Sequence, residues 1–235
     1  MVFDNFSPLR TPVKILKLYG SWQTKRSSWF YLAYGIFLHL LLIDLFVVLQ
    51  ICYLFSFETF EDLANVLTML PTYLTMVVKT IKFMTSVEEL KILFAMLKRC
   101  LEENPPGEKF QKRLWRIDKI YKFFWASAFI SCTLAISIPV FEHELLYRMW
   151  FPYTYDKNIF MFILGSIYQI FNTWICSTVD IVLDTFPVFF MCYIAGMLEQ
   201  ICERLEALND TTGNFMEFQK CIKQHLQVVK IAKHV

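Results

Sequence analysis

The residues of this chain that could take part in catalysis are its histidines, cysteines and carboxylates, but their spacing does not support catalysis. The histidines are scattered, and none of the seven cysteines forms a CxxC pair. No Gly-rich phosphate loop, HExxH helix or GxSxG elbow occurs. His143 lies between Glu142 and Glu144, a run that is more often a solvated loop edge than a metal site. We therefore predict no catalytic residue, no metal site and no cofactor.

Carboxylates inside apolar stretches are more informative. Asp44 interrupts a long apolar run, and an ionisable group at membrane depth is costly unless it faces protein or water. It is either a polar contact in an ion or ligand path, or a protonated or hydrogen-bonded group against a neighbouring helix; the second role is the more common. Asp180 and Asp184 share one helix face, and we expect them to anchor the exit of their helix from the membrane rather than bind a cation.

The elements that carry these residues are membrane spans. The chain has 235 residues, of which 56% are hydrophobic and 19% are charged, against about 25% charged in soluble domains. Its mean hydropathy is +0.43. A net charge of +2 without a basic patch argues against a nucleic-acid partner. The composition predicts a protein of the lipid bilayer.

Apolar runs long enough for a helix to cross a bilayer occur at 29–55, 63–78, 123–141 and 158–179. The second reaches full length if Lys79 and Lys82 extend to the lipid surface. A further run after Asp184 is either a fifth span broken at Pro187 or a continuation of the fourth. It is short and no polar turn precedes it, so we predict one continuous helix and an all-α membrane protein with four spans.

The distribution of Lys and Arg predicts the orientation. Both residue types are frequent in 1–28 and in the loop between the second and third spans, whereas 56–62 has none and 142–157 has only Arg148 and Lys157. By the positive-inside rule, the N-terminus is cytoplasmic. We therefore expect a cytoplasmic arm (1–28), a four-span region (29–198) with a cytoplasmic helix (86–101) and an extracellular loop (142–157), and a cytoplasmic helical pair (199–235). This orientation is opposite to that of a G-protein-coupled receptor.

The cytoplasmic helices are predicted to be amphipathic and to bury their apolar faces against protein. Ser86 and Glu89 form a capping-box pattern at the start of helix 86–101, and Asn104-Pro-Pro-Gly107 ends it. The expected buried stripes are Val87, Leu90, Phe94, Leu97 and Leu101; Phe110, Leu114, Ile117 and Tyr121; Leu198, Ile201, Cys202, Leu205 and Leu208; and Phe215, Phe218, Ile222, His225 or Leu226, and Val229.

Several motifs resemble the insect odorant receptor family. They are LDTF leading into GMLEQICERLEAL and then KCIKQHLQVVKIA, MWFPYTY at 149–155, and KLYGSW at 17–22. The most specific part is Cys221 and Ile222 followed by His225. The chain is similar to the N-terminal, four-span part of these seven-span proteins, whose N-terminus is cytoplasmic. The resemblance implies a subunit of an odorant-gated cation channel that acts in olfaction, as a heterotetramer with a co-receptor at the plasma membrane. On this interpretation the chain stops before the pore-lining span.

The resemblance also implies a pocket for a small, volatile, apolar ligand in the outer half of the bundle. Topology then selects the expected ligand-binding residues, which are Leu70, Tyr73, Thr133, Ile136, Ser137, Val140, Tyr168, Phe171, Asn172 and Ile175. A gustatory receptor of the same superfamily is an alternative, because its distinguishing motif would lie beyond Val235. A transporter fragment is another alternative, although we find none of the inverted repeats typical of that class.

Overall fold

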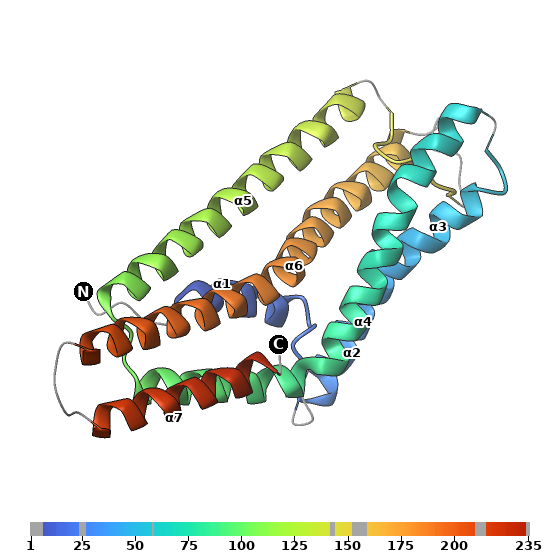
Figure 1. The fold of residues 1–235 in the computed structure, drawn as a ribbon. Coiled ribbons are helices and arrows are strands. Elements are labelled where there is room, and N and C mark those ends of the chain that lie inside the picture. The colour runs from blue at the N-terminus through green and yellow to red at the C-terminus, as the bar shows by residue number, and fades with distance from the viewer. Residues whose placement is uncertain are drawn as a thin grey trace. The chain divides into compact units, whose positions relative to one another are not determined.

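The computed structural model describes residues 7–23, 27–57, 59–141, 144–151, 159–209 and 215–233, and these residues form helices and connecting turns without a strand. The helices are α1 (Ser7–Leu18), α2 (Trp29–His39), the π-helical turn η1 (Leu40–Asp44), α3 (Leu45–Tyr53), α4 (Phe60–Glu103), α5 (Glu108–Phe141), α6 (Ile159–Asn209) and α7 (Phe215–Ala232) (Figure 1).

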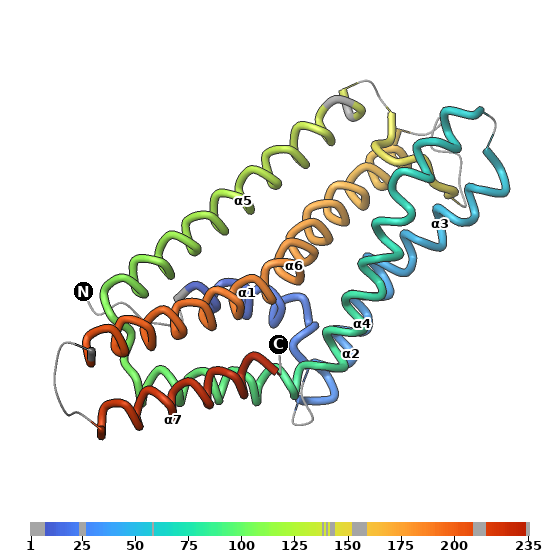
Figure 2. Tube along the Cα trace, in the orientation of Figure 1, coloured from blue at the N-terminus to red at the C-terminus, as the bar shows by residue number. Residues whose placement is uncertain are grey.

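Four helical segments of the described chain are long and apolar enough to cross a membrane: Trp29–Tyr53, Phe60–Glu103, Glu108–Ser137 and Ile159–Leu208. The predicted all-α, four-span class is confirmed. The tube in Figure 2 shows α6 as one uninterrupted helix, with Pro187 inside it. The apolar run after Asp184 is therefore a continuation of the fourth span, as predicted.

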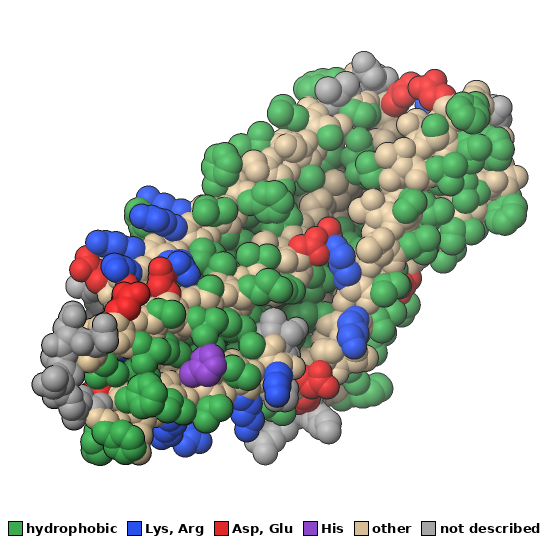
Figure 3. Space-filling view, viewed as in Figure 1, with side chains coloured by type: hydrophobic (Ala, Val, Ile, Leu, Met, Phe, Trp, Pro, Cys, Tyr) green, Lys and Arg blue, Asp and Glu red, His purple; other side chains and the backbone are tan. Residues whose placement is uncertain are grey.

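The chain divides into two compact units. Leu16–Thr85 and Phe123–Leu183 form one, which we call the apolar unit; Met1–Ile15, Ser86–Lys122 and Asp184–Val235 form the other, which we call the charged unit. Figure 3 shows hydrophobic side chains over much of the visible surface of the apolar unit, and Lys and Arg gathered over the charged unit. Exposed Phe30, Val78, Phe123 and Leu134 give the apolar unit faces suited to lipid.

The predicted start of a helix at Ser86 is wrong. Helix α4 runs without a break from Phe60 to Glu103, so the backbone N–H groups near Ser86 already have intrahelical partners and need no cap. The end of the helix is where the sequence predicted it. Asn104 follows Glu103, and the two prolines after it have no N–H to continue the helical ladder.

Aromatic contacts hold the charged unit together. The Phe94 ring of α4 packs edge-on against Phe190 of α6, with the ring centroids 5.2 Å apart. From α5, Phe110 packs against Tyr193 at 6.1 Å and Tyr121 against Phe189 at 5.4 Å. The apolar faces predicted for 86–101 and 110–121 are therefore buried against protein, and α6 is a partner of both.

The stripes predicted for α6 and α7 are largely wrong. In α7 the buried residues are Cys221, Gln224, Val228 and Ile231, whereas Phe215, Phe218, Ile222, His225, Leu226 and Val229 are exposed. In α6, Ile201 is buried as expected, but Leu198, Cys202 and Leu205 are exposed. The physical reason is that each helix buries a glutamine with one amide atom hydrogen-bonded across the unit: Gln200 Nε2 donates to the Pro105 carbonyl, and Gln224 Oε1 accepts from Arg204. Apolar periodicity alone does not detect such a face.

Candidate ligand site

A buried hydrogen bond joins two of the predicted ligand-binding residues. The Tyr73 hydroxyl on α4 donates to Asn172 Oδ1 on α6 at 2.9 Å. Tyr73 is 6% exposed and Asn172 is 0% exposed. The Asn172 Nδ2 group donates in turn to the Leu42 carbonyl at 2.5 Å. One amide therefore links three of the helical segments that cross the apolar unit.

The π-helical turn η1 explains why a side chain is needed at that carbonyl. A π turn replaces the regular i→i+4 hydrogen bonds of the helix, and backbone carbonyls freed inside a membrane need other donors. Asn172 supplies one to Leu42, and the Tyr168 hydroxyl supplies another to the Leu41 carbonyl at 3.0 Å. Polar side chains of α6 thus donate hydrogen bonds to backbone carbonyls of the irregular turn in the first span.

Aromatic rings lie beside the polar pair on its Tyr73 side. Phe46 of α3 stacks on the Tyr73 ring with centroids 4.1 Å apart, and it meets Tyr147 edge-on at 5.5 Å. Leu70, one turn from Tyr73 on α4, is also buried. A hydrogen-bonding pair within an apolar, aromatic wall has the composition of a site for a small, mostly apolar ligand.

The described part of the loop before α6, residues 144–151, is hydrogen-bonded to the same end of the apolar unit. Gln169 Oε1 accepts from the Tyr147 N–H at 3.0 Å, and Gln169 Nε2 donates to the Tyr147 carbonyl at 2.8 Å. The Trp150 N–H donates to the Leu49 carbonyl at 3.1 Å. Burial raises the pKa of the Tyr147 phenol, so this side chain stays neutral at physiological pH.

The structure brings together only part of the predicted set. Tyr73, Tyr168 and Asn172 meet around η1. The hydroxyls of Thr133 and Ser137 instead donate to carbonyls of their own helix, at 2.8 Å each. The other predicted residues fall into three groups: Leu70 and Ile136 are buried, Ile175 is half-buried and Phe171 is exposed. The Val140 side chain lies outside the described residues.

Comparison with known proteins shows which family this chain belongs to. The model of the 7tm Odorant receptor family matches residues 59–235. The chain belongs to this odorant receptor family. It is also 24% identical over 237 aligned positions to Odorant receptor Or1 of Anopheles gambiae, an alignment that covers 91% of this chain and 56% of that receptor. The resemblance found in the motifs is thus confirmed, and this family member spans little more than half the length of its curated relative.

Odorant receptor family membership and the four apolar helices together establish a multi-pass membrane protein. They point to a receptor rather than an enzyme. Among the described residues, no group of three or more His, Cys, Asp or Glu side chains is placed to hold a metal ion. Glu142 and His143 of the predicted loop-edge run lie outside that part of the chain.

Asp44 of this odorant receptor family member has a partner that the sequence did not predict. Its Oδ2 atom lies 3.0 Å from Nδ1 of His39, on the same span. Residues five apart lie on different faces of an α-helix, but the π turn between them brings them together. The expected bond to a neighbouring helix is therefore wrong in its partner. The i, i+5 spacing gave no signal for this pair, because the two residues meet only through the π turn.

The roles that the sequence predicted for Lys79 and Asp180 also differ from what the structure shows. Lys79 was expected to extend to the lipid surface and Asp180 to anchor a helix exit. Instead the Lys79 Nζ atom on α4 lies 3.0 Å from Asp180 Oδ1 on α6, with both side chains about one-third exposed. The pair neutralises two charges inside the apolar unit, which lowers the cost of keeping either of them there.

A stack of aromatic rings joins the third span to α6. Phe129 stacks between Trp125, at 5.7 Å, and Trp174, at 5.3 Å. Nearby, Cys132 Sγ and Ser177 Oγ are 3.4 Å apart. Few residues of the apolar part of α5 are buried, which agrees with the finding that the hydroxyls of Thr133 and Ser137 donate to their own helix.

Sequence reasoning missed Phe46, Gln169 and the Leu42 carbonyl. Phe46 stands among the apolar residues between Asp44 and Gln50, where no periodicity distinguishes it. Gln169 had a usable signal, because an uncharged amide within a span needs hydrogen-bond partners. The Leu42 carbonyl is made available by the π turn, which hydropathy does not reveal.

Proposed function

We propose that this chain is part of an odorant receptor subunit that, with a co-receptor, forms an odorant-gated cation channel in the plasma membrane. The observation that carries the proposal is the buried Tyr73–Asn172 hydrogen bond within an aromatic wall, in a chain of the odorant receptor family. We infer that the co-receptor assembles with the subunit as a heterotetramer.

The proposed ligand is a small, volatile, mostly apolar molecule with one polar group. Its apolar part packs on Phe46 and Leu70, and its polar group replaces one partner of the Tyr73–Asn172 bond. The other predicted residues of α5 and α6 complete the site when the ligand is bound. A ligand that binds one conformation more tightly shifts the population toward it. Because Asn172 donates a hydrogen bond to the Leu42 carbonyl of η1, ligand binding at Asn172 directly affects the first span.

The proposed orientation places the N-terminus in the cytoplasm and residues 142–157 outside the cell. The support is the uneven distribution of Lys and Arg, which favours the cytoplasmic side. In this orientation the Tyr73–Asn172 pair and the loop that covers Phe46 lie toward the exterior, where odorants arrive.

A receptor carrying these residues at full length, expressed with the co-receptor in oocytes, provides the test. Tyr73→Phe and Asn172→Ala should each shift half-maximal odorant concentrations by about threefold to tenfold, the effect of losing one hydrogen bond. They should also change the rank order of odorants. Thr75→Val is the matched control, because this exposed hydroxyl of α4 donates to the Pro71 carbonyl of its own helix. Unchanged dose–response curves for both site variants would contradict the proposed site.

A further inference from the structure

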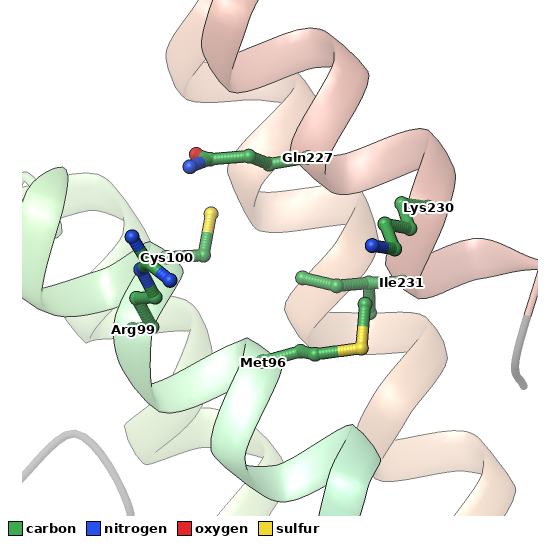
Figure 4. Close-up of a pocket in the computed structure, with 6 residues that line it drawn as sticks. All are labelled: Met96, Arg99, Cys100, Gln227, Lys230 and Ile231. Carbon is green, nitrogen blue, oxygen red and sulfur yellow. The ribbon is translucent and has the colours of Figure 1, made fainter.

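A cavity of about 260 Å³ lies between α4 and α7 within the charged unit. Its lining is Met96, Arg99 and Cys100 from α4, and Gln227, Lys230 and Ile231 from α7 (Figure 4). We call it the Cys100 cavity. All six residues belong to the charged unit, so the cavity is separate from the candidate odorant site. Pockets for drug-sized ligands have volumes of about 300–1,000 Å³, so this cavity suits a smaller molecule.

The cavity has cationic groups on two sides. Arg99 and Lys230 are both exposed at its rim, and Figure 4 shows the Lys230 ammonium on the side that faces the cavity. Arg99 uses its Nε group to donate to Glu103 Oε1 at 2.9 Å. A guanidinium has further N–H groups on its two terminal nitrogens, and no described acceptor takes a bond from those of Arg99. Lys230 has no ion pair with any described residue.

Gln227 forms part of the cavity wall. Its Nε2 group donates to Glu103 Oε2 at 2.8 Å, which fixes the orientation of the amide. Its Oε1 atom is buried, so a molecule in the cavity does not reach it. Met96 and Ile231 offer apolar contact beside these polar groups.

We propose that the Cys100 cavity binds a small phosphate ester. The phosphate oxygens accept from Arg99 and Lys230, and the carbon skeleton lies on Met96 and Ile231. A phosphate carries more charge near neutral pH than a carboxylate does, which suits two flanking cations. Glu103 holds Arg99 and Gln227 in position without lining the cavity. This site is independent of the proposed odorant site.

The test is direct binding to the 235-residue chain in phosphatidylcholine nanodiscs. One arm titrates glycerol 3-phosphate and inorganic phosphate by calorimetry. The other compares nanodiscs with and without phosphatidylinositol 4-phosphate. Saturable binding of the soluble probes alone identifies a free metabolite, and binding of the lipid alone identifies a headgroup; either supports the site. Binding should weaken as ionic strength rises.

Lys230→Gln and Arg99→Gln should each weaken binding about tenfold, the effect of one charge-assisted hydrogen bond. Lys230→Arg keeps the charge and should bind within about threefold of the wild type. Lys220→Gln is the matched control, because it removes the same charge from α7 outside the cavity lining. Absence of saturable binding to the wild type, or equal weakening by Lys220→Gln and Lys230→Gln, would overturn the proposal. Since odorant-evoked current is not measured, failure here leaves the odorant proposal untouched.

Discussion

Lys79 of α4 and Asp180 of α6 form an ion pair 3.0 Å long inside the apolar unit. Both side chains lie in helices that qualify as membrane spans, where an unpaired charge is expensive. The pair therefore links the second and fourth spans. It fixes how far one helix is shifted along the other, which hydrophobic packing alone does not determine.

Exchanging the two charges tests this link. Lys79→Asp and Asp180→Lys should each lower the thermal midpoint of the detergent-solubilised chain, because each places two like charges together. The double exchange should recover most of the loss, with a coupling free energy of about 1 kcal/mol, within the range found for polar pairs in membranes. Lys82→Asp, on the same helix, is the matched control. Additive losses in the double variant would mean that the residues act separately.

The contact between Gly20 and Gly35 gives a second prediction. Gly20 has a φ of +78°, and a Cβ at Gly35 would collide with the Gly20 carbonyl oxygen and the Gln23 side chain. The collision with backbone is not relieved by a rotamer change, so Gly35→Ala should destabilise the fold by about 1–3 kcal/mol. Gly107→Ala is the control, because nothing lies within 4 Å of a Cβ there. The thermal midpoints of the two variants, measured side by side, should differ clearly; equal midpoints would contradict the contact.

How far the sequence determines this fold depends on the kind of signal. Uncharged runs located the four spans, because crossing a bilayer requires length and apolarity. The polar character of Tyr73 and Asn172 at comparable depth brought both into the predicted site. Their mutual hydrogen bond was not foreseen, because it depends on the rotation of α4 against α6.

Other predictions from the sequence were wrong for identifiable physical reasons. The Ser86 pattern resembles a helix start, but the tertiary structure continues α4 through it. The apolar side chains of α7, such as Phe215 and Leu226, indicated the wrong face, because Gln224 is buried instead, with its Oε1 atom accepting a hydrogen bond from Arg204. In both places a local pattern was overridden by a long-range contact.

Topology supplies a third prediction. The sequons at Asn5 and Asn209 should remain unmodified in microsomes, because we propose that both are cytoplasmic. A sequon introduced into 144–151 should be glycosylated, which a mobility shift reversed by endoglycosidase would reveal. Replacing Asn5 or Asn209 by Gln provides the control for background bands. Glycosylation at either native site would reverse the proposed orientation.

Arg204 gives the last prediction, because it joins α6 to α7 and to Asn104, the residue that follows α4. Its Nη1 group donates to Asn104 Oδ1 at 3.1 Å and to Gln224 Oε1 at 2.9 Å. Gln224 is 1% exposed, so Arg204→Leu leaves a buried carbonyl without a donor. We expect a loss of about 1–3 kcal/mol and faster proteolysis near α7, measured by limited trypsin digestion with mass spectrometry. Lys112→Leu removes a cation from an exposed i, i+4 pair with Glu108 and, apart from the loss of cleavage at position 112 itself, should leave the rate of cleavage within α7 unchanged. Gln224→Leu combined with Arg204→Leu should restore part of the loss, since no orphaned amide then remains. If the double variant were digested faster than Arg204→Leu alone, the hydrogen bond would not be the cause of the stabilisation.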